Sequence, residues 1–260
     1  MRRAARLLAI AAACAASALA IAQSQEMPTE EAGEATAQSA EQDAPPGTDY
    51  VDLRRAKPIT GNAAAGQAKS ALCATCHGPQ GISIAPTFPN IAGQRADFFY
   101  WQLVEFKRNP DSPMSPLVAD LGEQDMLDLA AYYAGLAPPP ADPAAEPAPV
   151  DATLAERGEQ LYLAGDPGKG IPPCQGCHGI DADGHADALR TDRDGHTPYA
   201  SYPALRGQQA IYLQTKLAQY RNGEMDDSTT DFVMTGVAER LDDDSIEALS
   251  AWLSSLPPAR

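Results

Sequence analysis

The sequence predicts an all-α protein that consists of two tandem helical domains. Apolar residues recur at spacings of three, four and seven in several stretches, which is typical of amphipathic helices, and the period-two alternation of strands is nearly absent. Similar motifs and apolar stripes also occur in the same order in both halves of the chain. The two halves are therefore expected to share one fold.

The best-defined repeated motif is C-x-x-C-H. It occurs as Cys73-Ala74-Thr75-Cys76-His77 and again as Cys174-Gln175-Gly176-Cys177-His178. This motif is typical of c-type haem attachment, in which two thiols add to the haem vinyl groups and the next histidine binds the iron. The sequence therefore predicts two covalent haem c groups, with His77 and His178 as iron ligands and with thioether bonds from Cys73, Cys76, Cys174 and Cys177.

Other uses of the paired cysteines fit the sequence less well. A zinc ribbon needs two C-x-x-C pairs about 15 to 20 residues apart, whereas 97 residues separate Cys76 from Cys174. A thioredoxin-like redox pair belongs in a βαβ context, and no such pattern surrounds either motif. Structural disulfides would not explain why a histidine follows both pairs.

Residues 1–22 are expected to form a signal peptide, with basic residues near Met1, an apolar run from Leu7 and small residues before a cut ahead of Gln23. Cys14 lies inside this segment and is interpreted as part of the discarded peptide. A lipoprotein acceptor is the less favoured alternative, because the leucine expected three residues earlier is missing. Bacterial haem c attachment takes place outside the cytoplasm, so the signal and the motifs together predict a periplasmic protein.

Two segments lack the composition of a folded core. Residues 23–57 carry eight acidic and three basic side chains and are expected to form a disordered acidic leader. Residues 138–150 are rich in proline and alanine and are expected to form a semi-rigid linker. The predicted domains are therefore 58–137 and 151–260.

The helices within the two domains are predicted as matching pairs. Residues 96–108 and 210–222 each form an amphipathic stripe, and each domain closes with another helix. Gly66 and Gly158 are placed on helices that lead into the two C-x-x-C-H motifs. Domains of about 80 to 110 residues have thin cores, so the apolar stripes are expected to pack around the haem. Their residues are Phe99, Leu103, Phe106, Met126, Leu129, Ala130 and Tyr133 in the first domain, and Leu213, Leu217, Tyr220, Ile246, Leu249, Ser250 and Leu253 in the second.

The second domain contains an insertion, residues 180–201, with His185, His196 and five aspartates. A calcium site or an alternative histidine ligand is conceivable. The spacing matches no EF-hand loop, so a solvated loop is favoured.

The charge of the chain is strongly acidic, with a formal net charge of −16. Residues 58–138 carry seven acidic and four basic side chains, net −3, whereas residues 151–260 carry 18 and nine, net −9. Nucleic acids and anionic membrane surfaces are poor partners for such a protein. A basic protein partner is more plausible on charge.

With its two C-x-x-C-H motifs, the paired segments 88–94 (FPNIAGQ) and 202–208 (YPALRGQ), and a methionine ahead of each final helix, the chain resembles the dihaem cytochrome c4 family. The resemblance covers about residues 58–258. It implies two class I cytochrome c domains related by a pseudo-twofold axis, histidine and methionine on both irons, and electron delivery in bacterial respiration. The acidic leader, the linker and the 180–201 insertion depart from the family's pattern.

The resemblance also assigns further site residues. It implies that Met114 is the distal ligand of the first iron, and that the carbonyl groups of Pro89 and Pro203 accept the histidine ring N–H. For the second iron the internal repeat favours Met234 over Met225, because Met234 precedes Leu241 by seven residues, as Met114 precedes Leu121. Placing Met225 on the iron would draw carboxylates of its loop towards the apolar haem face, which is costly.

The leading functional hypothesis is an electron carrier that takes no small-molecule substrate and exchanges electrons with redox proteins, such as a membrane respiratory complex or a terminal oxidase. Iron with two protein ligands has no open position, so only outer-sphere transfer remains. The alternatives are a dihaem enzyme of the peroxidase or thiosulfate dehydrogenase type, which needs an open or labile iron position, and the cytochrome subunit of a dehydrogenase complex.

Overall fold

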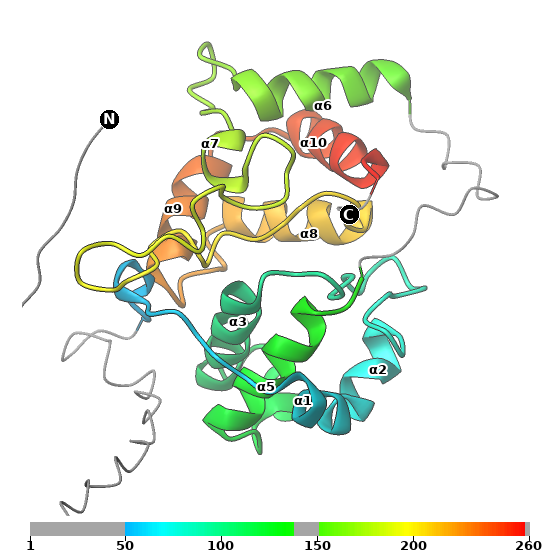
Figure 1. Cartoon of the computed structure of the whole chain (residues 1–260). Coiled ribbons are helices and arrows are strands. Elements are labelled where there is room, and N and C mark those ends of the chain that lie inside the picture. Colours follow the sequence, from blue (N-terminus) through cyan, green and yellow to red (C-terminus); the bar gives the residue numbers. More distant parts are fainter. Residues whose placement is uncertain (1–49, 138–150, 258–260) are drawn as a thin grey trace, which may run out of the picture. The chain divides into compact units, whose positions relative to one another are not determined.

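The computed structural model describes residues 50–137 and 151–257 (Figure 1). The predicted signal peptide, leader residues 23–49 and the linker 138–150 lie outside the described residues. The described part forms helices and two isolated β-bridges and contains no strand, which confirms the all-α prediction. Within these ranges, none of the helices has the length and apolar character that spanning a bilayer demands.

The helices occur as two sets in the same order, which agrees with the predicted repeat. The first set comprises α1 (Ala63–Lys69), α2 (Ala71–His77), α3 (Ala96–Arg108), α4 (Ser115–Val118) and α5 (Glu123–Ala134). The second set comprises α6 (Ala152–Ala164), α7 (Gln175–His178), α8 (Ala210–Arg221), α9 (Thr229–Ala238) and α10 (Asp243–Ser255). Each C-x-x-C-H motif therefore ends on the second helix of its set.

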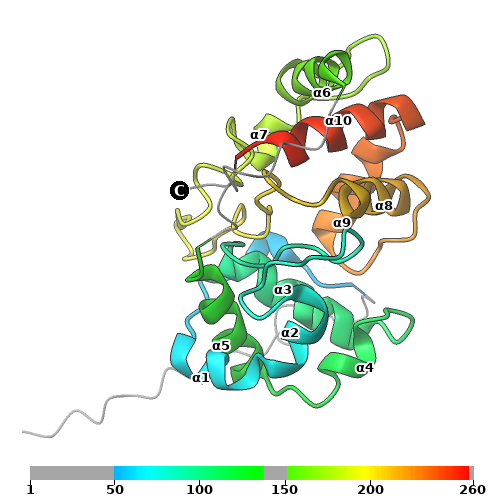
Figure 2. The same cartoon turned by 90° about the vertical axis from the view of Figure 1, so that its right-hand side faces the viewer.

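Each domain is built on a close crossing of its first and last helices, α1 with α5 and α6 with α10 (Figures 1 and 2). A Cβ atom added to Gly66 in α1 would lie 2.0 Å from the carbonyl oxygen of Asp128 in α5. A Cβ atom on Gly158 in α6 would lie equally close, 2.0 Å, to the carbonyl oxygen of Ala248 in α10. Glycine lets the two helix backbones touch at the same place in both domains.

Two apolar cores lie beside these crossings. The first includes Trp101, Leu103 and Leu129 from α3 and α5, and the second includes Leu213, Leu249 and Leu253 from α8 and α10. The predicted stripes thus supply the centre of both cores. Phe106, Leu217 and Tyr220 are only partly buried at the edges of the cores.

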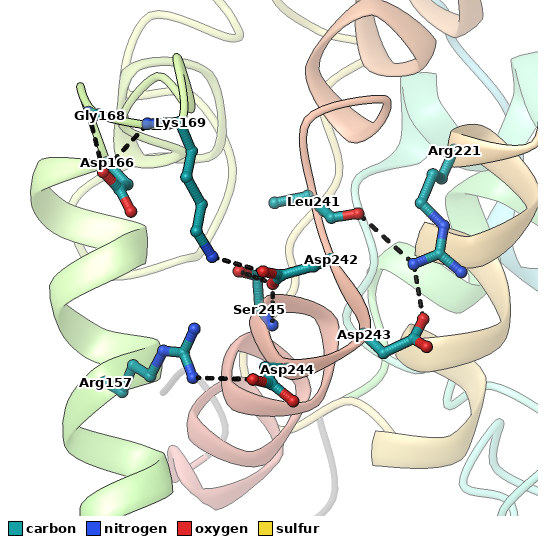
Figure 3. Close-up of polar contacts among 10 residues, drawn as sticks. All are labelled: Arg157, Asp166, Gly168, Lys169, Arg221, Leu241, Asp242, Asp243, Asp244 and Ser245. Carbon is teal, nitrogen blue, oxygen red and sulfur yellow. Dashed lines mark hydrogen bonds and ion pairs between the residues drawn. The ribbon is translucent and has the colours of Figure 1, made fainter.

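Acidic residues at the N-terminus of α10 contact α8 and the loop between α6 and α7 (Figure 3). Asp242 caps the helix, accepting a hydrogen bond from the backbone N–H of Ser245 at 2.9 Å, and forms an ion pair with Lys169. The hydrogen bond from Lys169 lowers the pKa of the Asp242 carboxyl. Arg221 of α8 pairs with Asp243 at 2.7 Å. Carboxylates also suit the positive end of the helix dipole.

The end of the predicted leader is not disordered. Val51 forms a parallel bridge with Ser228, and the adjacent 3-10 helix η2 (Leu53–Arg55) buries Leu53. The N–H of Val51 donates to the carbonyl of Asp227 at 2.8 Å, and the N–H of Thr229 donates to the carbonyl of Val51 at 2.9 Å. The prediction was wrong for residues 50–57 because the acidic average of the whole segment concealed a short run with apolar residues. We call residues 51–56 the strap.

The insertion 180–201 is also more buried than a solvated loop. Ala182, Ala188 and Ala200 are buried, and the carbonyl of Ala182 accepts hydrogen bonds from the backbone N–H groups of Leu205 and Arg206. The N–H of buried Thr197 donates to the carbonyl of Ala56 in the strap at 2.7 Å. The small side chains of the alanines allow this packing. The prediction of a solvated loop was wrong because it relied on the five aspartates and ignored these alanines.

Candidate haem-binding sites

The two C-x-x-C-H motifs adopt similar local structures. In the first domain, Cys73, Cys76 and His77 all lie on α2, whereas in the second domain Cys174 is the N-cap of the shorter α7. The four cysteines form no disulfide and are half-buried. In both motifs the helix ends at the histidine because the next residue, Gly78 or Gly179, has a φ of 79°.

Both motif histidines are buried, and each contacts the carbonyl group that the resemblance to the cytochrome c4 family implied. The Nδ1 atom of His77 lies 3.0 Å from the carbonyl oxygen of Pro89, and that of His178 lies 3.1 Å from the carbonyl oxygen of Pro203. A carbonyl oxygen only accepts, so Nδ1 carries the proton and Nε2 keeps its lone pair. Each imidazole is thereby held in the tautomer that binds a metal through Nε2.

Three of the cysteines, Cys73, Cys174 and Cys177, lie in surroundings that disfavour the charged thiolate. Burial raises the pKa of Cys73 and of Cys177, and it raises the pKa of Cys174 to about 11. Reactive redox cysteines and cysteine metal ligands need the thiolate form, so the surroundings suit neutral thioether sulfur better than either alternative.

The side chains beside the motifs fit a large apolar group. Phe88 packs edge-on to His77 with ring centroids 6.1 Å apart, and Tyr202 packs the same way on His178 at 6.2 Å. Apolar side chains near the motifs or the methionines in sequence are unusually exposed, among them Leu72 at 53%, Leu117 at 43% and Ile180 at 61%. Exposed apolar surface of this kind marks binding sites. Thiols, imidazole, thioether sulfur and apolar walls together match the needs of haem c.

The predicted methionine ligands lie in different local structures. Met114 immediately precedes α4 and packs against the first core, whereas Met234 lies within α9. Both are half-buried, and so is the competing Met225. The sulfur of Met225 lies 3.9 Å from the ammonium group of Lys216. The assignment of Met114 and Met234 to the iron atoms stays a prediction.

Sequence reasoning missed a buried acidic pair between the domains. Glu105 of α3 and Asp231 of α9 are both buried. Removal from water, with a contribution from the negative charge of Asp231, raises the pKa of Glu105 well above its ordinary value. Gln102 donates a hydrogen bond to Glu105, and Tyr220 donates one to Asp231 at 3.0 Å. The apolar periodicity of α3 could not reveal that a carboxyl group lies on its buried face.

Sequence reasoning also assigned no role to two glutamines, Gln94 and Gln208, at the ends of the paired segments 88–94 and 202–208. The side chain of Gln94 hydrogen-bonds the backbone of Ala204, and the side chain of Gln208 hydrogen-bonds the backbone of Asn90. Their equivalent positions in the repeat were the available signal.

Comparisons with known proteins find relatives among c-type cytochromes. A family model described as cytochrome c matches residues 155–257. The chain is 39% identical over 203 residues to cytochrome c4 of Thiocapsa roseopersicina, covering 77% of this chain and 96% of that protein. It is 33% identical to a thiosulfate dehydrogenase electron acceptor of Thiomonas intermedia, covering 75% of this chain and 82% of that protein.

A solved structure gives the same result for the fold. The crystal structure of reduced recombinant cytochrome c4 from Pseudomonas stutzeri superposes with a TM-score of 0.64 at 32% sequence identity. The match covers 76% of this chain and 100% of that one.

Proposed function

The chain belongs to the cytochrome c4 family, and from this premise we propose that it carries electrons in the bacterial periplasm towards a terminal oxidase. The family membership makes it a dihaem electron carrier with two covalent haem c groups, and not an enzyme. Redox proteins are accordingly its partners. The periplasmic location and the terminal oxidase as electron acceptor are the proposed part.

We assign the axial ligands as His77 and Met114 in the domain of residues 58–137, and as His178 and Met234 in the domain of residues 151–260. The bound haem supplies an iron that alternates between the ferrous and ferric states. The observation that carries the assignment is the matched pair of contacts from the histidine rings to Pro89 and Pro203, at 3.0 and 3.1 Å. These contacts orient the rings and increase their donor strength, and thioether sulfur raises the reduction potential.

The predicted signal peptide of residues 1–22 supports the periplasmic location, since it agrees with haem attachment outside the cytoplasm. N-terminal sequencing of the mature holoprotein is expected to begin at Gln23. A mature chain that begins at a lipid-modified Cys14 would instead support the anchored alternative.

Absorption spectroscopy tests the carrier assignment. The ferric protein is expected to show the far-red methionine-to-iron band for two haems, and carbon monoxide is expected to perturb neither ferrous haem at neutral pH. The reason is that two protein ligands leave no open position on either iron. Rapid binding of carbon monoxide to one haem of the intact protein would overturn the proposal.

A second candidate function adds a specific electron donor. The relative from Thiomonas intermedia is named as an electron acceptor of thiosulfate dehydrogenase, so the corresponding proposal is that a periplasmic thiosulfate dehydrogenase reduces this chain. Fast reduction of the ferric protein by thiosulfate dehydrogenase would favour this donor.

The oxidase as acceptor has its own test. Mixing the reduced protein with membranes that contain a terminal oxidase is expected to give oxygen-dependent reoxidation that slows as ionic strength rises, because the carrier is acidic. Absence of reoxidation would contradict the oxidase as acceptor.

A further inference from the structure

The peptide groups that hold the two histidines each make a second hydrogen bond, in which the peptide N–H donates to a side chain of the other domain. The carbonyl of the Pro89–Asn90 peptide accepts the hydrogen bond of His77, while the N–H of the same peptide donates to Oε1 of Gln208 at 2.8 Å. In the opposite direction, the Pro203–Ala204 peptide accepts the hydrogen bond of His178 and donates to Oε1 of Gln94 at 3.0 Å.

The two glutamines are held in the same way. Gln208 Oε1 also accepts from the backbone N–H of Gln209, and Gln94 Oε1 from that of Arg95, both at 2.9 Å. Each side-chain amide returns a second bond across the interface, from Gln208 Nε2 to the carbonyl of Asn90 at 2.8 Å and from Gln94 Nε2 to the carbonyl of Ala204 at 3.0 Å. Each glutamine side chain therefore bonds both the N–H and the carbonyl group of one residue in the opposite domain, Asn90 for Gln208 and Ala204 for Gln94.

A peptide group transmits polarisation between its two ends. When its N–H donates a hydrogen bond, its carbonyl oxygen becomes more negative and a better acceptor, because hydrogen bonds in a chain strengthen one another. A better acceptor draws more strongly on the imidazole N–H, which increases the electron donation of Nε2 to a metal. Stronger donation stabilises ferric iron and lowers the reduction potential.

We propose that Gln94 and Gln208 are positioning residues that lower the reduction potential of the haem in the opposite domain. Gln208 acts on the first haem through the Pro89–Asn90 peptide and His77. Gln94 acts on the second haem through the Pro203–Ala204 peptide and His178. The proposal rests on the proposed ligation of the iron atoms by the two histidines.

The test is the substitution of each glutamine by leucine in the full-length holoprotein. NMR-monitored redox titration follows the two haems separately through their assigned methyl signals. Gln208→Leu is expected to raise the potential of the first haem more than that of the second, and Gln94→Leu is expected to do the reverse. Exchange of the ring Nδ1 proton with solvent should accelerate at His77 in the first variant and at His178 in the second.

The matched control is Gln209→Leu. The side chain of Gln209 also bonds across the interface, with Nε2 donating to the carbonyl of Ser83 at 3.0 Å, but it contacts neither proline peptide. Gln209→Leu is expected to leave both potentials and both ring protons as in the parent protein. Equal shifts of both haems in all three variants, or shifts in the haem of the mutated domain, would overturn the proposal.

The outcome also separates this inference from the proposed function. If the parent protein shows no strongly shifted histidine signals from both domains, the proposed ligation itself is wrong. If those signals are present and the leucine variants shift neither potential in the crossed sense, the ligation stands and the role of the glutamines is refuted.

Discussion

Single substitutions can test which methionine, Met234 or Met225, binds the iron of the second haem. Met234→Ala is expected to abolish the methionine-to-iron band of the second haem, lower its potential and open it to carbon monoxide, because the iron loses its thioether ligand. Met225→Ala is the matched control and is expected to change none of these. The result is obtained from ferric and ferrous-carbonyl spectra of both variants, and reversed behaviour would show that the repeat alignment fails in this loop.

A buried carboxyl group makes stability depend on pH in a defined direction. The raised pKa of Glu105 means that the folded protein holds a proton there which the unfolded chain loses near pH 4 to 5. Stability therefore falls as pH rises from the unfolded pKa towards the folded one. Glu105→Gln is expected to remove this loss, so its advantage over the parent protein should grow between pH 4 and pH 8.

Denaturant unfolding at several pH values measures this effect. Glu156→Gln, at an exposed position of α6, removes a carboxyl group without touching the buried pair and serves as the control. A Glu105→Gln variant whose stability relative to the parent is the same at pH 4 and pH 8 would contradict the assignment.

At the level of helices, the crossing of α6 and α10 depends on the missing side chain of Gly158. Gly158→Ala would place Cβ 2.0 Å from the carbonyl of Ala248, so the helices must separate. The expected loss is about 1–3 kcal/mol of unfolding free energy, although alanine is ordinarily favoured over glycine within a helix by up to about 1 kcal/mol. Urea unfolding of the holoprotein is the measurement.

Glu159→Ala, on the exposed side of the same helix, is the control for this substitution and is expected to change stability by about 0.5 kcal/mol or less. If Gly158→Ala proves as stable as the parent protein, the close crossing does not occur in solution.

The helices and their order could be predicted well because apolar periodicity reports directly on buried faces. Residues 96–108 form α3 with the predicted bounds, and α8 ends one residue before the predicted 222. The segment before the last helix was less predictable. In the second domain, Ser228 and Asp231 form a reciprocal capping box that starts the ten-residue α9, whereas Pro116 stands in the first turn of the four-residue α4. Met114 and Met234 stand at the same distance from the last helix of their domains, but the structures around them differ.

The sequence points to candidate site residues where one short motif carries the chemistry, as for the cysteines, His77 and His178, whose attachment to haem stays a prediction. The strap, the crossed glutamines and Glu105 could not be predicted, because their roles come from contacts between segments far apart in the sequence. Leu53, for example, donates its backbone N–H to the hydroxyl of Thr229, 176 residues later. Composition and periodicity describe a segment by itself and carry no information on which distant segment it will contact.

For the whole molecule, the uneven charge of the domains predicts the order of reduction. Net charge is −9 over residues 151–260 and −3 over residues 58–138. Negative charge stabilises ferric iron and so lowers the potential, although exposed charges are screened beyond about 10 Å. We expect a modest offset in which the first-domain haem is reduced first.

The intact chain is the right material for this measurement, since hydrogen bonds between the domains disappear if they are expressed separately. Redox titration monitored by the haem methyl signals gives the order directly. The charge argument fails if the second-domain haem has the higher potential.

The strap also has a consequence for the order in which the chain can fold. It precedes the first domain in sequence, yet its backbone pairs with residues 227–229 of the second domain. During synthesis the first domain is complete long before those partners exist, and contacts so distant in sequence close slowly. The strap can therefore dock only after residues 227–229 have emerged, and its docking joins the two domains at a late step of folding.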